Sequence, residues 1–216
     1  MGPEVLERVT TPRGELQLQR RGEQYEIISN GVFLMATYNG ESERLLVTAA
    51  LDAAPTPARV LIGGLGVGFS LAAALRDSRT AQATVVEIEP QLIEWNRSHL
   101  APFSDNGLAH PKARVVNADL VAWIHEADEQ FEAICLDIDN GPDWTVTEEN
   151  RGLYGDEGLR AVQRLLAPGG VVAYWSALRA PAFAEHLARY YGKVEELPVA
   201  QVRGEPDYLY LASAPK

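Results

Sequence analysis

Three acidic residues, Glu87, Asp119 and Asp137, each follow a run of apolar residues. If those runs are neighbouring parallel strands, the three carboxylates meet at one edge of a sheet, where such folds bind their ligands. A carboxylate about twenty residues after a glycine-rich turn, as Glu87 is, can accept both hydroxyls of a ribose. Asp119 can reach an adenine amino group or cap the following helix. The spacing therefore predicts a nucleoside site with a further acid, Asp137, beside it.

The glycine-rich turn lies between an apolar run and a segment with helical spacing. Glycine lets a backbone turn tightly and approach a ligand closely, and the helix that follows offers free amide hydrogens. We expect this turn to bind the nucleoside, although close packing would also explain glycines in such a turn. The candidate binding residues are Gly63, Gly64, Gly66 and Gly68.

A long loop follows Asp137 and is strongly acidic. Between Asp137 and Glu157 the chain has seven acids and one base. Such a rim attracts a cationic ligand and repels an anionic one. Asp139 is the second candidate acid for catalysis, and Trp144 and Tyr154 are candidates for the pocket wall because aromatic faces hold cations.

The sequence also indicates roles for two further side chains. Trp175, which lies in an apolar run, either walls the pocket or packs in the core. Glu89 follows Glu87 by two residues and is expected to be a solvated acid at the end of its strand.

The elements that must position these residues alternate along the second part of the chain. Short apolar runs predict strands at residues 59–63, 83–88, 113–117, 131–137 and 170–175. Helical spacing predicts helices at about 69–77, 90–99, 119–127, 156–166 and 181–191. This alternation predicts an α/β fold with a Rossmann-like, doubly wound, mainly parallel sheet. The runs 194–199 and 208–212 predict a C-terminal antiparallel hairpin.

The first part of the chain predicts a separate small lobe. Apolar residues cluster in short runs between about residues 15 and 36, and the Asn30-Gly31 pair predicts a tight hairpin turn. A helix over 42–52 is expected to follow, with Ser42 as its N-cap. We therefore predict a small N-terminal β-hairpin lobe plus helix over residues 1–56 and a nucleoside-binding catalytic domain over 57–216.

The composition of the chain limits the kinds of partner that we expect it to bind. The 216 residues include 19 Lys and Arg against 30 Asp and Glu, a formal charge of −11, which disfavours nucleic acid. The longest uncharged stretch, residues 60–75, is too short and glycine-rich to span a membrane. With no recognisable export signal, we expect a cytoplasmic protein.

The cysteine, the histidines and two absent motifs limit the classes of reaction that we expect. Cys135 lies in an apolar run and is expected to be buried and inert. The four histidines lack the spacing of metal ligands, so we expect no metal. The chain has no Gly-x-Ser-x-Gly turn and no lysine after the glycine turn, which argues against hydrolases and nucleotide triphosphatases.

Five motifs in order resemble those of the class I S-adenosylmethionine-dependent transferases, and most closely the spermidine synthase (polyamine aminopropyltransferase) family. The resemblance covers about residues 25–178 and implies the class I methyltransferase fold. The motifs are Gly-Gly-Leu-Gly-Val-Gly at 63–68, Val-Glu-Ile-Glu-Pro at 86–90, Asn-Ala-Asp at 117–119, Leu-Asp-Ile-Asp at 136–139 and Leu-Ala-Pro-Gly-Gly-Val at 166–171.

The resemblance implies a role for each motif. The glycine turn would hold the methionine-like part of a sulfonium nucleoside, Glu87 with Ile88 the ribose, and Asp119 with Leu120 the adenine. Asp137 would face the attacking amine. The implied reaction moves an aminopropyl group from decarboxylated S-adenosylmethionine to a small cationic amine, and the resemblance also implies a homodimer.

Departures from the family pattern keep other functions open. Asn140 stands where the family has its second acid, with Asp139 offset by one, and Glu43-Arg44 stands where it has Tyr and Gln. Arg44 becomes a candidate substrate-binding residue that could pair with a carboxylate. One alternative is a small-molecule methyltransferase that uses intact S-adenosylmethionine on the same fold. Another is a non-catalytic nucleoside-binding subunit.

Overall fold

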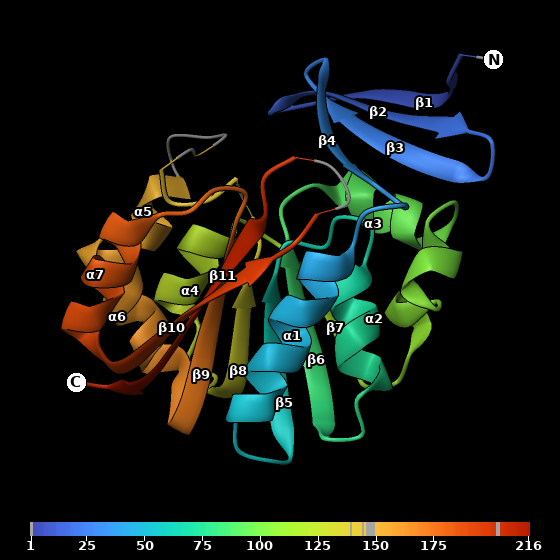
Figure 1. Ribbon diagram of the computed structural model, residues 1–216. Helices are drawn as coiled ribbons and strands as arrows, with labels where there is room; N and C mark the ends of the chain where they lie inside the picture. The colour runs from blue at the N-terminus through green and yellow to red at the C-terminus, as the bar shows by residue number, and fades with distance from the viewer. Residues whose placement is uncertain (1, 139, 144, 146–149, 202–203) are drawn as a thin grey trace.

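Two β-sheets make up the scaffold of the protein, as Figure 1 shows. The computed structural model describes residues 2–138, 140–143, 145, 150–201 and 204–216. A four-stranded antiparallel sheet comes first in the chain, and a seven-stranded sheet with helices on both faces follows. No helix in these described ranges is both long and apolar enough to cross a membrane.

The N-terminal sheet has the strand order β1-β2-β3-β4. Its strands are β1 (Glu4–Thr11), β2 (Gly14–Arg21), β3 (Gln24–Ser29) and β4 (Val32–Ala36). Asn30 and Gly31 both have positive φ, 50° and 78°, as the predicted hairpin turn requires. Strand β1 was not predicted, because its residues are half exposed and lack a clear apolar pattern, and a bulge interrupts its pairing with β2.

The seven-stranded sheet has the order β10-β11-β9-β8-β5-β6-β7. Strands β5 to β9 run parallel, and β11 pairs antiparallel with both β9 and β10. The fold class predicted from the sequence is therefore confirmed, including the C-terminal hairpin. The strands are β5 (Ala58–Gly63), β6 (Thr80–Glu87), β7 (Ala113–Asn117), β8 (Phe131–Leu136), β9 (Leu166–Ser176), β10 (Tyr191–Val199) and β11 (Asp207–Pro215).

Helices cover both faces of this sheet with separate apolar clusters. On one face lie α1 (Glu41–Ala53), α2 (Phe69–Arg76) and α3 (Pro90–Arg97). On the other lie α4 (Leu120–Glu126), α5 (Arg151–Tyr154), α6 (Asp156–Leu165) and α7 (Pro181–Tyr190). Each predicted helix is present within a residue or two of its expected ends.

Helix α1 packs on the large sheet and not on the N-terminal lobe. Its buried residues Leu46, Val47 and Leu51 belong to the same cluster as Val60 of β5. Its N-cap is Gly40, so the prediction that Ser42 caps this helix is wrong. Ser42 lies inside the first turn and donates its hydroxyl elsewhere. The division at residue 56 stays a prediction.

The N-terminal sheet lies over the glycine turn and α3. Leu16, Leu18 and Ile27 from its strands share an apolar cluster with Val67 and Trp95. Burying such side chains stabilises the docking by roughly 1.5–3 kcal/mol each. The small sheet thereby forms a roof above the carboxyl edge of the parallel strands (Figure 1).

Candidate active site

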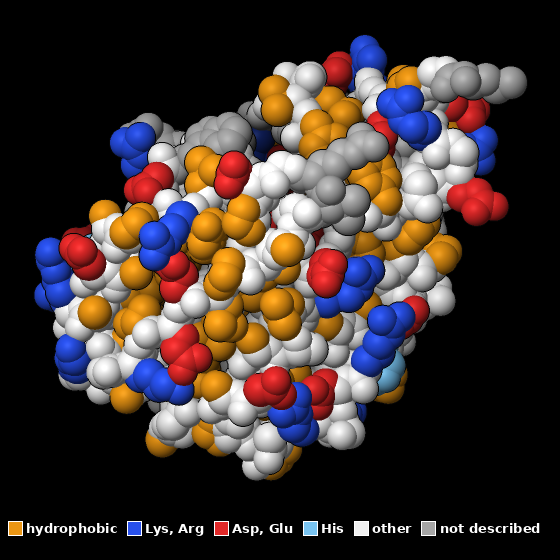
Figure 2. Space-filling view, in the orientation of Figure 1, with side chains coloured by type: hydrophobic (Ala, Val, Ile, Leu, Met, Phe, Trp, Pro, Cys, Tyr) orange, Lys and Arg blue, Asp and Glu red, His pale blue; other side chains and the backbone are white. Residues whose placement is uncertain are grey.

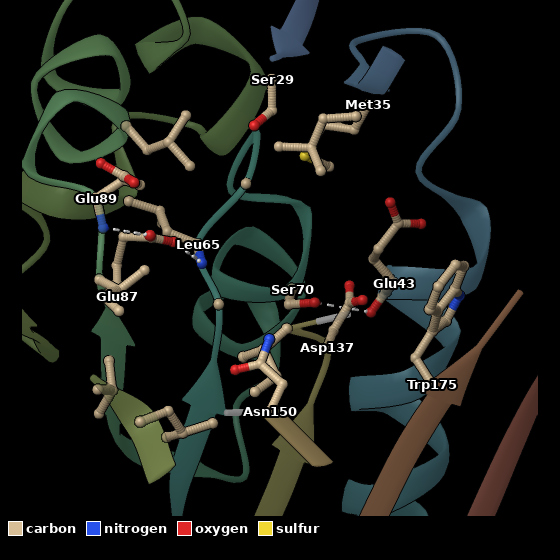
Figure 3. A pocket seen from close by; sticks show the side chains of 18 of the residues that line it. Ser29, Met35, Glu43, Leu65, Ser70, Glu87, Glu89, Asp137, Asn150 and Trp175 are labelled. Atoms are coloured by element: carbon tan, nitrogen blue, oxygen red, sulfur yellow. Dashed lines mark hydrogen bonds between the residues drawn. The ribbon is translucent and has the colours of Figure 1, made fainter. Parts of the chain in front are cut away.

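A cavity of about 300 Å³ lies between the roof and the carboxyl edge of the sheet. Residues from the small sheet, from α1 and from the loops after β5, β6, β7 and β8 all reach it. Figure 3 shows several of these side chains converging from opposite sides. The lining residues include Arg13, Glu43, Gly64, Gly66, Glu87, Ile88, Glu89, Asp119, Leu120, Asp137, Asn140 and Trp175.

The four glycines of the turn divide into two kinds. Gly64 and Gly66 line the cavity with φ of +90° and +51°. A Cβ on Gly64 would lie 2.3 Å from the backbone oxygen of Asp137, so only glycine allows β5 and β8 to end this close together. Gly63 and Gly68 are not among the lining residues, and a Cβ on either would meet a packed side chain.

Glu87 is 5% exposed at the end of β6 and lines the cavity. Its Oε2 accepts a hydrogen bond of 2.8 Å from the backbone N–H of Leu65, and its Oε1 accepts one of 2.7 Å from that of Glu89. Burial raises the pKa of Glu87, while these two hydrogen bonds counteract that rise. The carboxyl is thus fixed, and each oxygen keeps acceptor capacity for a ligand hydroxyl.

Glu89 is not a solvated acid, which corrects the sequence-based expectation. It is 8% exposed, lines the cavity and accepts a 2.6 Å hydrogen bond from Nε of Arg13. Nη2 of Arg13 also donates to the backbone oxygen of Ile88 at 3.0 Å. Arg13 comes from the turn between β1 and β2, so the roof is tied directly to the end of the cavity formed by Glu87, Ile88 and Glu89. The sequence did not reveal this pairing because the partners are 76 residues apart.

Asp119 is the N-cap of α4 and accepts a 3.2 Å hydrogen bond from the backbone N–H of Ala122. It also lines the cavity, as Leu120 does. The two roles considered for Asp119 are therefore compatible, because a capping carboxylate still has lone pairs facing the cavity.

Asp137 directly follows β8 at the opposite side of the cavity from Glu87, and Figure 3 shows it next to Glu43 of α1. Burial raises the pKa of Asp137 well above its usual range, and the nearby carboxyls of Glu43 and Asp207 raise it further. Burial also raises the pKa of Glu43 and of Asp207, the first residue of β11. Three acids with high proton affinity thus gather at this end of the site.

Two predicted substrate residues lie away from the cavity lining. The guanidinium of Arg44 lies over the Phe69 ring, 4.1 Å from its centre, so α1 turns Glu43 and not Arg44 to the cavity. Tyr154 is buried against Phe183 in an edge-to-face contact. Trp175 lines the cavity and packs partly in the core, which combines its two expected roles.

Asp139 and Trp144 lie outside the described residues, so their predicted roles stay predictions. Cys135 is fully buried, and burial beside Asp137 raises the pKa of its thiol to about 12. A thiol held in its protonated form is a poor nucleophile, which agrees with an inert role.

The family model for the spermine/spermidine synthase domain matches residues 41–193. The chain belongs to the spermine/spermidine synthase family. The match begins at α1 and ends within β10, so it includes the glycine turn, Glu87, Asp119 and Asp137. The roof strands and β11 with Asp207 lie outside it.

Curated relatives of this spermine/spermidine synthase family chain are polyamine aminopropyltransferases. Polyamine aminopropyltransferase 1 of Streptomyces coelicolor is 33% identical over 127 residues, 58% of this chain and 23% of that protein. Polyamine aminopropyltransferase 1 of Hyperthermus butylicus is 29% identical over 157 residues, 70% of this chain and 52% of that protein. The matched part thus spans about a quarter to a half of their lengths.

Solved spermidine synthases share the fold of this family member. One, in complex with the transition state analogue AdoDATO, superposes with a TM-score of 0.82 at 17% identity, covering 97% of this chain and 73% of that chain. The enzyme from Thermotoga maritima gives a TM-score of 0.80 at 16% identity, covering 97% of this chain and 72% of that one.

Proposed function

We propose that the protein transfers an aminopropyl group from decarboxylated S-adenosylmethionine to a small cationic amine. The observation that carries this proposal is the placement of two acidic ends on one cavity of about 300 Å³. Glu87, Ile88, Asp119 and Leu120 form the end that suits a nucleoside, and Asp137 with Glu43 forms the end that suits an ammonium group. Family membership supports the same assignment.

The charge of the cavity favours the decarboxylated donor over intact S-adenosylmethionine. Intact donor carries a carboxylate that needs a cationic partner when it is buried. Among the described lining residues the single basic side chain is Arg13, and it is already paired with Glu89. The decarboxylated donor lacks this carboxylate and keeps only the ammonium group, which the surrounding acids can hold.

The protein's task in this reaction is to align the amine and to take its proton. The amine nitrogen forms a bond to the propyl carbon next to the sulfonium, and the carbon–sulfur bond breaks with its electron pair going to sulfur. Gly64 and Gly66 allow the donor to approach the backbone, and Glu87 fixes its sugar. Holding the partners in line in this way replaces much of the entropy cost of a bimolecular encounter.

Asp137 is the residue we assign to the proton. A primary amine with a pKa near 10.4 arrives as an ammonium ion and must lose a proton to attack. The raised pKa of Asp137 makes this carboxylate a stronger base than an exposed aspartate. Proton transfer to a positioned base contributes roughly 10²–10⁴-fold to such reactions.

Incubation with each donor and a panel of di- and polyamines, followed by mass measurement of the products, tests the proposed function. We expect an aminopropyl adduct with the decarboxylated donor and none with S-adenosylmethionine. A methyl adduct would instead establish a methyltransferase. The absence of any product, together with tight nucleoside binding, would support a non-catalytic subunit.

A further inference from the structure

Asp207 reaches the candidate amine end of the cavity through neighbouring side chains. It is the first residue of β11, outside the family match and not among the lining residues. Its Oδ2 accepts a hydrogen bond of 2.7 Å from the hydroxyl of Ser42, which is 2% exposed in the first turn of α1. The same Oδ2 accepts a 2.5 Å hydrogen bond from the side-chain amide of Gln201. Asp207 is thus held firmly against α1.

Ser42 also contacts Glu43, so its hydroxyl lies between two carboxyls. Oγ of Ser42 is 3.0 Å from Oε2 of Glu43 and 2.7 Å from Oδ2 of Asp207. A hydroxyl has a single hydrogen, so it can donate to only one of these carboxyls. The other contact is a hydrogen bond only if that carboxyl carries a proton. The Ser42 hydroxyl therefore hydrogen-bonds both carboxyls when one of them is protonated, a state that the raised pKa of each carboxyl favours.

The charges around this pair favour retention of a proton. Asp207 faces Glu43 from β11 and Asp137 faces it from β8, and their negative charges oppose its ionisation. Arg44, on the same helix, favours ionisation of Glu43 but holds its guanidinium over Phe69. An ammonium ion placed among these carboxyls would stabilise their charged forms and displace the proton.

Trp175 adds an aromatic wall to the same corner. Its indole ring lies beside Glu43 in Figure 3, and an indole face attracts a cation. Its Nε1 is buried with no partner in hydrogen-bonding geometry among the described residues, although it lies near enough to Asp207 to lower the pKa of that carboxyl. Carboxyls and an aromatic face around one opening suit an alkylammonium group.

We propose that Asp207 is a positioning residue of the acceptor site, which acts through Ser42 to hold the Glu43 carboxyl beside Asp137, so that an ammonium group of the amine binds between Glu43 and Asp137. This inference rests on the proposed function and adds to it an acceptor-specific unit made of Ser42, Glu43 and Asp207. Binding of the amine releases the proton held by Glu43 or Asp207. The unit thus supplies, from α1 and β11, a negative charge that Asn140 does not provide after β8.

The Asp207→Asn substitution tests this role, with Asp128→Asn as the matched control. Asp128 is fully exposed before β8, at the other edge of the sheet, so its variant loses the same charge far from the cavity. We expect Asp207→Asn to raise KM for 1,4-diaminobutane about tenfold, the effect of weakening one charged hydrogen bond, with KM for the donor unchanged.

The pH profile separates positioning from mere structural support. The charge of Asp207 raises the pKa of Asp137, so its removal should let Asp207→Asn keep a larger fraction of its maximal kcat/KM at pH 5.5 than wild type keeps. Calorimetry of 1,4-diaminobutane binding in phosphate and Tris buffers should show proton release by wild type and less by the variant. A purely structural role would change neither measurement.

Ser42→Ala provides a second variant that leaves both carboxyls in place. We expect it also to raise KM for the amine and not for the donor, because Glu43 loses its link to Asp207. The inference is overturned if both variants match Asp128→Asn in amine KM, pH profile and proton release. Wild type that transfers no group to any amine would instead overturn the proposed function.

Discussion

At the scale of single residues, the site places its acids in two chemically different settings. Glu87 accepts two backbone N–H groups and is fixed in one orientation. Asp137 has other carboxyls for neighbours, which increase its affinity for protons. Fixed acceptors suit recognition of hydroxyls, and a carboxylate with raised pKa suits proton transfer. The two ends of one cavity are thus specialised by their surroundings.

Replacing Asp137 with Asn should separate binding from chemistry. The amide has nearly the same shape but takes no proton, so we expect kcat to fall by roughly 10²–10⁴-fold. Affinity for 5′-methylthioadenosine, measured by calorimetry, should stay within about twofold because Glu87 and the glycine turn are untouched. Unchanged turnover would show that Asp137 does not take the proton.

Replacing Glu87 with Gln should have the opposite effect. A charged hydrogen bond contributes about 1.5–3 kcal/mol, so affinity for 5′-methylthioadenosine should fall roughly 10–100-fold. Glu94→Gln, on the exposed face of α3, is the matched control and should bind as wild type does. Equal affinities of the two variants would show that Glu87 does not bind the nucleoside.

The sequence predicted the acids that end strands and missed those that depend on packing. Glu87, Asp119 and Asp137 follow apolar runs, and parallel strands bring such positions to one edge. Glu43 was missed because the direction of a helical side chain depends on where the helix begins, and α1 is capped by Gly40 and not Ser42. Asp207 was missed because only the pairing of β11 with β9 brings it to this site.

At the scale of elements, the turn between β5 and α2 determines how closely three strands can meet. The backbone N–H of Gly64 donates to the oxygen of Val86, and that of Asp137 donates to the oxygen of Gly63. The sequence predicted these strands because buried parallel strands are continuously apolar. It missed β1, whose half-exposed residues lack that pattern.

An alanine at Gly64 should test this close approach. Gly64 and Gly204 have almost the same φ, +90° and +91°, but only Gly64 lacks space for a Cβ. We expect Gly204→Ala to cost about 1–2 kcal/mol of unfolding free energy from backbone strain alone and to keep transfer activity. Gly64→Ala should cost more and should lower kcat/KM, because it pushes Asp137 away. Urea unfolding and transfer rates measure both effects, and equal results for the two variants would contradict this account.

At the scale of the whole molecule, the roof covers a cavity of about 300 Å³ that gathers acids from several elements. The space-filling view in Figure 2 shows acidic and basic side chains mixed over the visible surface. Acids and bases are thus interspersed on that face, whereas the cavity has five acids and one base among its described lining residues. This concentration attracts cations and also opposes folding when the acids ionise.

The destabilisation caused by ionised acids should appear as a pH dependence of the unfolding free energy. Asp137 has a higher pKa in the folded protein than the value near 3.9 of an unfolded chain, so the folded state binds more protons. Stability is then greatest below pH 4 as far as this group is concerned, and it decreases as pH rises through the folded-state pKa.

The Asp137→Asn substitution removes this destabilisation. We expect the unfolding free energy of the variant to be about 0.5–2 kcal/mol higher than that of wild type at pH 8 and nearly equal to it at pH 4. Urea titrations at both pH values, with Asp128→Asn as the control, measure the difference. A variant less stable than wild type at pH 8 would show that Asp137 stabilises the fold at that pH. The raised pKa of Asp137, on which its role as proton acceptor depends, would then be contradicted.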